Sequence, residues 1–399
     1  MKYKKVYLDN SATTIMHPEV IKEMQKYFYK IYGNPSSLHN FGKNAKIAIE
    51  KAREEVAVLL NANPSEIFFT GSGTESNNIA IFGIVNNVCG KQIHVITSKI
   101  EHHSVLNSIK HIEKCGHEVT YLDVDKHGII SVEDLKKNIK NNTLLVSIMH
   151  ANNEVGSLQS IDKIAIEIKK INNKREQKIY LHSDSVQTAG KIPIDVKRIG
   201  VDLLSLSAHK FNGPKGVGVL YIKNGTHISP MFFGGHHEKG IRPGTENVPA
   251  IVGLAKAFKI ANNNLQKDKI YISHLREKLK TGIINTISEV TINGDEKTTI
   301  YNILNVSFNH VEGEALLLML DMKGIAVSTG SACASETISP SHVLSAMQID
   351  PVVIHGTIRF SFGHYNTNKD IDYVLGVLHT IVEKLRSMSP TFNKKSRNI

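Results

Sequence analysis

Short apolar runs of strand length alternate with stretches that carry apolar residues at helical spacing over the first two-thirds of the chain. A strand followed by a crossover helix and another strand is typical of a mostly parallel sheet with helices on both faces, so the pattern predicts an α/β fold. The expected strands are residues 66–70, 93–96, 144–149, 179–182, 203–206 and 217–221, and the expected helices begin near Thr74 and span 104–115 and 161–172.

The pattern changes near Ala250, where long helical stretches give way to short strands and further helices. This change predicts a second, smaller α+β domain. The expected helices are 251–264, 267–287, 313–323 and 368–387, and the expected strands are 290–292, 304–308, 325–328 and 357–361. The segment before Pro18 is expected to be an extended arm that returns to the small domain or to the domain interface.

The length of 399 residues exceeds what one small core needs, so two domains are expected. We place the large domain at residues 16–259 and the small domain at 1–15 plus 260–399. Apolar residues make up 41% of the chain and charged residues 21%, which is typical of a soluble globular enzyme. No apolar run reaches the roughly 20 residues that span a bilayer, and no apolar stretch of signal-peptide length follows the basic start. These features predict a cytoplasmic protein without a membrane partner.

The net charge of +11 raises the question of an acidic partner or nucleic acid. The lysines are scattered along amphipathic stretches, which favours a solvated surface, and no direct nucleic-acid binding is expected. Three cysteines cannot form a disulfide framework, and none lies in a Cys-x-x-Cys pair. Cys89 and Cys115 are expected to be small buried apolar residues.

Cys333 lies among small residues in the segment 328–335, where a thiol can move and be reached. Far upstream, Lys210 follows the apolar run 203–206 and precedes the turn 213–216. A lysine placed beside polar donors in an apolar setting can lose its proton and form an imine. A reachable thiol together with such a lysine predicts carbon–sulfur chemistry on an amino acid.

Other polar residues allow two interpretations each. The loop 71–78 between a strand and a helix suits a phosphate or a plain helix cap, and Ser76 departs from the dinucleotide pattern. Asp184 ends a strand, where it could hold a pyridinium N–H or cap the next turn. His102 could stack on a flat ring or be structural. Arg359 could bind a carboxylate or form an internal ion pair.

Adjacent histidines occur at 102–103 and at 236–237. Neighbouring side chains on one element point to different sides, and no cysteine or carboxylate completes a ligand set at familiar spacing. No metal site is predicted.

The motifs taken together resemble the cysteine desulfurases of the NifS/IscS class, which belong to the class-V aminotransferases. The resemblance implies a fold-type I pyridoxal-phosphate enzyme with a mostly parallel seven-stranded sheet and a small α+β domain. It covers nearly the whole chain and is carried by segments 7–14, 33–39, 101–102, 149–156, 207–210, 242–247, 330–333 and 358–361.

The resemblance also implies how pyridoxal 5'-phosphate would be held. Lys210 would bond to the cofactor through its amine, Asp184 would pair with the ring nitrogen, and Gln187 with the phenolic oxygen. His102 would stack on the ring and move protons. The remaining cofactor contacts would come from Asn153 and from the phosphate-binding residues Gly73, Thr74, Ser207, His209 and, from the neighbouring subunit of a homodimer, Thr245.

By the same resemblance, Asn153 and Arg359 would fix the carboxylate of L-cysteine. Cys333, on a mobile loop at about 328–340, would take the sulfur as a persulfide and release L-alanine. The acceptor would be an iron–sulfur scaffold or a tRNA thiolation enzyme, and Cys333 could transiently ligate a cluster on a scaffold.

Two alternatives remain at this stage. A selenocysteine lyase or a small-substrate aminotransferase would still release alanine after Cys333→Ala. An RNA-associated assembly platform that keeps the fold without turnover would stay colourless with the cofactor, and its RNA binding would weaken with salt.

Overall fold

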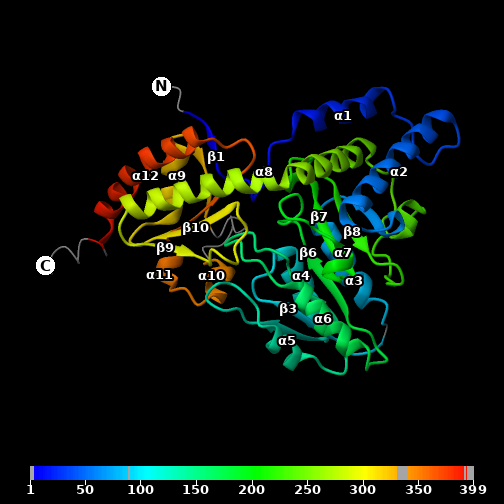
Figure 1. Cartoon of the computed structure of the whole chain (residues 1–399). Helices are drawn as coiled ribbons and strands as arrows, with labels where there is room; N and C mark the ends of the chain where they lie inside the picture. Colours follow the sequence, from blue (N-terminus) through cyan, green and yellow to red (C-terminus); the bar gives the residue numbers. More distant parts are fainter. Residues whose placement is uncertain (1–3, 89, 330–339, 391, 393–399) are drawn as a thin grey trace.

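The computed structural model describes residues 4–88, 90–329, 340–390 and 392, and Figure 1 shows them as a larger and a smaller domain joined by one long helix. The larger sheet has seven strands in the order β2-β8-β7-β6-β5-β3-β4, and only β8 runs antiparallel to its neighbours. The prediction of a mostly parallel sheet is therefore confirmed. Its strands are β2 (Ile67–Thr70), β3 (His94–Ser98), β4 (Glu118–Leu122), β5 (Thr143–Ser147), β6 (Tyr180–Asp184), β7 (Leu203–Ser207) and β8 (Gly218–Ile222).

Helices cover both faces of this sheet because successive strand residues point to opposite sides. Phe69 and Leu204 pack in one apolar core with helices α1, α2, α6 and the first half of α8, whereas Phe68 and Leu203 pack in another with α3 and α4. The helices here are α1 (Pro18–Tyr29), α2 (Asn40–Leu60), α3 (Gly73–Val85), α4 (His103–Lys114), α5 (Val132–Asn138), α6 (Ile161–Asn172) and α7 (Val196–Ile199), with 3-10 turns η1 (Pro64–Glu66), η2 (Ala208–Lys210) and η3 (His237–Gly240).

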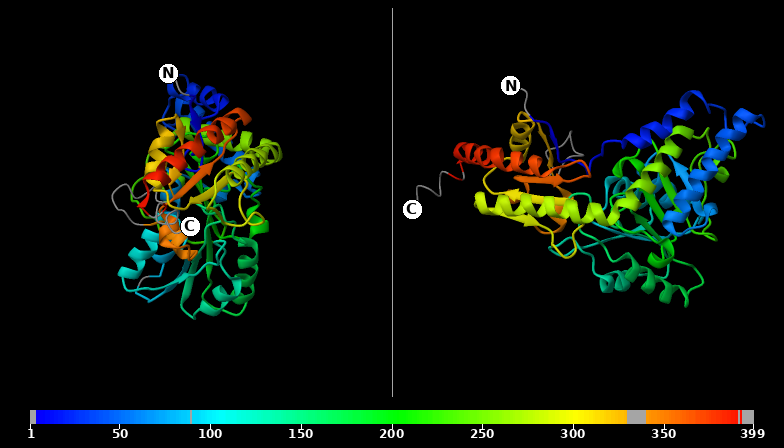
Figure 2. Two further views of the ribbon diagram at one scale, coloured as in Figure 1. Left: turned by 90° about the vertical axis from the view of Figure 1, so that its left-hand side faces the viewer. Right: turned by 45° about the horizontal axis from the view of Figure 1, so that its top comes forward.

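Helix α8 (Val248–Thr286) runs without interruption from one domain to the other, as Figures 1 and 2 show. The prediction of two helices separated near residue 265 is wrong. The apolar pattern lapses there because the helix leaves the core that holds Phe258 and enters the core that holds Ile272. No glycine or proline interrupts the polar middle, so the backbone continues as a helix.

The small domain contains an antiparallel sheet in the order β12-β13-β10-β9. Helices α9 and α12 pack with α8 in its core. The elements are β9 (Val290–Asn293), β10 (Ile303–Phe308), α9 (Gly313–Asp321), β11 (Ile325–Ala326), β12 (Ser328–Thr329), α10 (His342–Ala346), α11 (Pro351–Ile354), β13 (Thr357–Ser361) and α12 (Asn368–Met388).

The N-terminal arm joins this domain, because β1 (Val6–Tyr7) pairs in parallel with β11. The expected arm is thus confirmed, but the single strand expected at 325–328 is two. Ile325 pairs with Val6, whereas Ser328 pairs with Arg359 in the four-stranded sheet. Among the described residues, none of the helices combines the length and hydropathy needed to cross a bilayer.

Candidate active site

The N-terminus of α3 meets the carboxyl ends of β6 and β7, the edge at which open α/β sheets bind ligands. A Cβ atom on Gly73 would lie 2.7 Å from Val186 Cγ2 and 3.4 Å from Ser207 Cβ, so only glycine permits this approach. Ser72 caps the helix by accepting a hydrogen bond from Glu75 N. The helix cap and an N-terminus suited to an anion are therefore both present at one place.

Asp184 and His102 are linked by two residues that sequence reasoning missed. Asn77 donates from Nδ2 to Asp184 Oδ2 at 2.7 Å and to Ser104 Oγ at 2.9 Å, and Ser104 Oγ lies 2.8 Å from His102 Nδ1. Asp184 Oδ1 also accepts from Val186 N at 3.0 Å, so it caps the local turn as well. Asn77 could have been noticed only by its helical spacing from Gly73, which places both on the buried side of α3.

The His102 ring is a helix cap whose Nδ1 accepts from Ser104 N at 3.1 Å, so Nε2 carries the proton of the neutral ring. Burial lowers the pKa of His102, Asp184 opposes this effect, and the charge of Lys210 adds to it. The imidazole is therefore neutral near pH 7, beside both Asp184 and Lys210.

Lys210 ends η2, the short turn after β7, and its amine faces the N-terminal arm. Nζ donates to Ser11 O at 2.6 Å and to Ala12 O at 2.7 Å. Gln187 Nε2 donates to the same Ser11 O at 3.0 Å, while Gln187 Oε1 is buried without a partner among the described atoms. The structure thus brings Lys210 and Gln187 together around one backbone carbonyl.

His209 also faces the arm. Its Nδ1 lies 3.1 Å from Thr13 Oγ1, and burial, reinforced by Lys210, lowers the pKa of His209 to about 4. The imidazole is uncharged at neutral pH.

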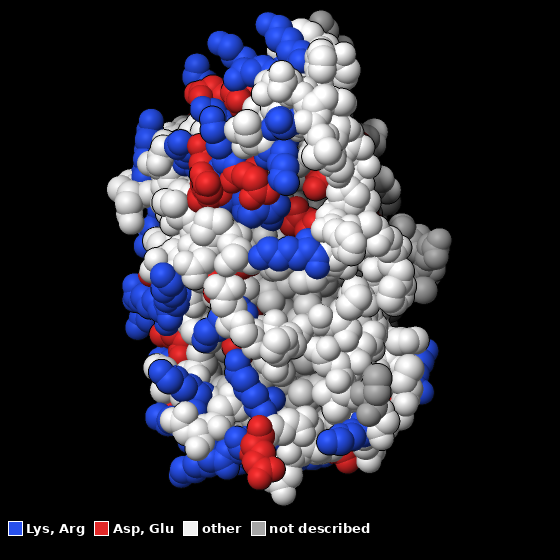
Figure 3. Space-filling view, turned by 90° about the vertical axis from the view of Figure 1, so that its right-hand side faces the viewer, with Lys and Arg blue, Asp and Glu red and all other residues white. Residues whose placement is uncertain are grey.

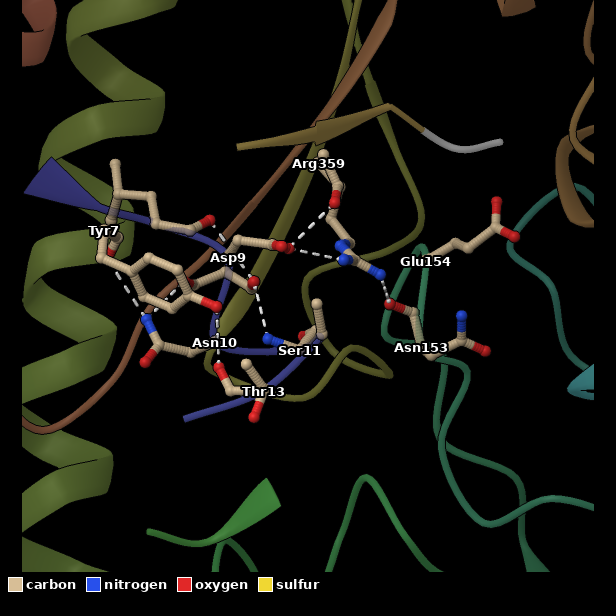
Figure 4. Close-up of polar contacts among 12 residues, drawn as sticks. Tyr7, Asp9, Asn10, Ser11, Thr13, Asn153, Glu154 and Arg359 are labelled. Carbon is tan, nitrogen blue, oxygen red and sulfur yellow. Dashed lines mark hydrogen bonds and ion pairs between the residues drawn. The ribbon is translucent and has the colours of Figure 1, made fainter. Parts of the chain in front are cut away.

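Arg359, on β13, is 4% exposed and points between the arm and the loop after β5 (Figure 4). Nη2 lies 2.7 Å from Asp9 Oδ1, and Nη1 donates to Asn153 O at 2.9 Å. Nε is buried with no partner among the described residues. The internal ion pair therefore exists, and the guanidinium keeps unused donors for a further acceptor.

Two buried carboxyl groups flank the site and were not predicted. Burial raises the pKa of Glu154 to about 7, although Ser341 and Arg359 oppose the effect. Burial likewise raises the pKa of Glu101 to about 8, opposed by hydrogen bonds from Ser98 and Met149 N. Sequence reasoning singled out their neighbours Asn153 and His102. It missed the two glutamates because nothing in the sequence shows that a glutamate will be buried.

Other predicted residues differ in their placement. Thr74 follows Gly73 at the N-terminus of α3 with an exposed side chain, and Thr245 is also exposed. Cys333 and Cys89 lie outside the described residues. Cys115 is exposed, so the prediction that it is buried is wrong: it follows the last residue of α4 instead of lying on that helix's buried side. The described part of the chain has no group of three or more His, Cys, Asp or Glu that could hold a metal ion.

The residues present fit pyridoxal phosphate. Gly73 lets the N-terminus of α3 approach Val186 and Ser207 closely, Gln187 Oε1 is an orphaned polar atom, and Asp184 is a buried carboxylate that, like Lys210, acts on the charge of His102. Fold and site thus define a pyridoxal-phosphate enzyme built on an α/β sheet.

Comparisons with known proteins agree. The model of the family described as aminotransferase class-V matches residues 6–374. The chain is 48% identical to the cysteine desulfurase IscS of Dictyoglomus turgidum, covering 98% of this chain and 100% of that protein. It is 48% identical to the cysteine desulfurase IscS of Methanosarcina thermophila, covering 99% and 96%.

Solved structures give the same picture. A NifS-like protein is 40% identical with a TM-score of 0.89, covering 96% of this chain and 100% of that one. The structure titled SspA in complex with cysteine is 33% identical with a TM-score of 0.79, covering 91% and 100%. The chain belongs to the cysteine desulfurases, the pyridoxal-phosphate enzymes of the class-V aminotransferase family that transfer sulfur.

Proposed function

We propose that Lys210, His102 and Cys333 carry the reaction that converts L-cysteine to L-alanine and a persulfide on Cys333. The observation that supports this best is the meeting of the Lys210 amine, Gln187 and the arm at Ser11 O. We also propose the domain division at 16–259 and 1–15 plus 260–399, which the pairing of Val6 with Ile325 supports.

The cofactor contacts follow from the residues described above. Asp184 would keep a ring N–H in place, Gln187 would meet the phenolic oxygen, and neutral His102 would stack and pass a proton at Nε2. Bound in this way, the cofactor supplies an electron sink that makes the substrate α-proton acidic. Lys210 would hold it through Nζ, and its phosphate would lie at the α3 N-terminus among Gly73, Thr74, Ser207 and His209.

Substrate recognition would rest on Arg359 and Asn153. Arg359 has a fixed position and unused donors, of which Nε is buried without a partner among the described atoms. A carboxylate is the acceptor that best matches a guanidinium. The α-carboxylate of L-cysteine is therefore the proposed ligand, with Asn153 beside it.

Sulfur transfer would belong to Cys333. Its thiolate attacks the substrate sulfur while the carbon–sulfur bond breaks, the bonding electrons pass to the substrate carbon, and that carbon gains a proton to become alanine. The persulfide would then pass to an iron–sulfur scaffold or a tRNA thiolation enzyme in the cytoplasm, and Cys333 could transiently ligate a cluster there.

A homodimer is part of the proposal, because Thr245 is exposed and would serve the partner's phosphate site. The face on the side of α1 and α2 has a broad area without charged side chains (Figure 3). The segment from the end of α1 to the start of α2 also exposes large apolar residues, and exposed apolar surface of this kind marks an interface. They are Phe28, Tyr29, Tyr32, Leu38 and Phe41.

The test is to add L-cysteine to wild type, to Cys333→Ala and to the control Cys115→Ala. The Cys333→Ala variant should keep the cofactor absorbance but release no sulfide, whereas the control should behave as wild type because Cys115 is exposed at the end of α4. Mass spectrometry should find one extra sulfur atom on the Cys333 peptide. Alanine release that survives in Cys333→Ala would instead favour a lyase or aminotransferase.

A further inference from the structure

Asp9 holds the guanidinium that is proposed to bind substrate. Its Oδ1 lies 2.7 Å from Arg359 Nη2 and also accepts a hydrogen bond from Ser328 Oγ at 3.0 Å. Both side chains of the ion pair are shielded, with 5% of Arg359 and 17% of Asp9 exposed. At such a position the carboxylate cancels much of the positive charge that an incoming anion would meet.

The other ionisable groups facing this pair do not restore that charge. Glu154 follows Asn153 on the other side of Arg359, and with its raised pKa of about 7 it adds negative charge as the pH rises. Tyr7, on the arm, is uncharged at neutral pH because burial and Asp9 raise its pKa. A substrate carboxylate therefore competes with Asp9 for one cation.

Both substrate and product need this cation, because L-alanine carries the same α-amino and α-carboxylate groups as L-cysteine. An unopposed buried guanidinium would bind both strongly and slow the departure of the product. We propose that Asp9 is a positioning residue whose carboxylate weakens the binding of the α-carboxylate to Arg359, so that L-alanine leaves after sulfur transfer. This inference rests on the proposed role of Arg359.

The test compares wild type with Asp9→Asn, which keeps an oxygen acceptor for Arg359 and Ser328 but removes the charge. Binding of L-alanine to the cofactor-loaded enzyme, measured by calorimetry, should tighten about tenfold, because the charged hydrogen bond from Asp9 to Arg359 is replaced by a weaker neutral one. KM for L-cysteine should fall, and kcat should fall as alanine release slows. Cysteamine, which has no carboxylate, should bind equally well to both proteins.

Alanine binding that is unchanged or weaker in Asp9→Asn would overturn the inference. If this variant does not fold, Asp9→Ser also removes the charge and leaves a hydroxyl acceptor, and the same tightening is expected. An Arg359→Gln arm separates the two ideas. If Arg359→Gln binds L-alanine as well as wild type does, the proposed role of Arg359 is wrong, and the inference about Asp9 fails with it. If this variant no longer binds L-alanine but still binds cysteamine, the role of Arg359 stands, and the Asp9 variants then decide the inference.

Discussion

Replacing Lys191 by Met is expected to stabilise the protein near pH 7 and to destabilise it near pH 10.5. Lys191 is 9% exposed, and its Nζ donates to Gln187 O at 2.8 Å. No ion pair with a carboxylate of the described residues compensates its charge. Burial, with the charge of Lys210 as the second cause, lowers the pKa of Lys191 from 10.5 to about 7.

The magnitude follows from proton linkage. Between pH 7 and 10.5 the unfolded chain binds more protons at this lysine than the folded chain, so wild-type stability rises with pH across that window. About 3.5 pH units at 1.36 kcal/mol each set a ceiling of about 5 kcal/mol for the penalty, which is fully present at and below pH 7. Met keeps the apolar stem but leaves Gln187 O without its donor, at a cost of about 1–3 kcal/mol.

The free energy of unfolding of the Met variant should therefore exceed that of wild type by about 2–4 kcal/mol near pH 7 and fall below it by about 1–3 kcal/mol near pH 10.5. Urea unfolding of the cofactor-free proteins, followed by circular dichroism across this pH range, measures the difference. The control is Lys163→Met, because Lys163 is exposed and should show no pH-dependent difference. If the stability difference between Lys191→Met and wild type stays constant from pH 7 to 10.5, burial does not lower the pKa of Lys191.

Two further predictions concern groups that the catalytic proposal does not use. Glu101→Gln should have the same free energy of unfolding as wild type near pH 4.5 and exceed it by about a few kcal/mol above pH 8, because the raised carboxyl pKa costs wild type stability as the pH rises from 4.5 to about 8. Urea unfolding at both pH values measures this, and a difference that is the same at both would contradict it. Leu38→Asp should convert the proposed dimer to monomers in analytical ultracentrifugation, because Leu38 is 88% exposed; a stable dimer would place the interface elsewhere.

The sequence predicted six of the seven strands of the large sheet, because each of these six is a short apolar run that is almost wholly buried. The edge strand β4 was not predicted, because it has a mixed sequence and only its last residue is buried. The limits of α6, residues 161–172, were matched to the residue, since its apolar spacing is regular. The prediction failed where two cores follow one another along one helix, as in α8, and where a short run such as 325–328 divides between two sheets. These outcomes depend on tertiary contacts that the local pattern does not contain.

The site was predicted through residues with distinctive chemistry, such as Lys210 and Asp184. Asn77, which bonds Asp184, and Asp9, which bonds Arg359, were missed because both are ordinary polar residues until folding places them. Asn77 matters only because α3 packs on the ends of β6 and β7, and Asp9 only because the arm lies parallel to the end of β13. Sequence patterns report elements and reactive groups, whereas the partners of those groups follow from topology.

The N-terminal arm contacts both the proposed cofactor-binding lysine and the proposed substrate-binding arginine. Its strand pairs with β11, Asp9 bonds Arg359, and Ser11 O accepts from Lys210. Ser11 N in turn donates to Ser361 Oγ, two residues beyond Arg359, at 2.8 Å. Three consecutive residues thus bridge the lysine of one domain and the arginine of the other. Any displacement of the small domain must move the proposed substrate-binding arginine and the support of the proposed cofactor-binding lysine together, since both rest on the same short stretch of backbone.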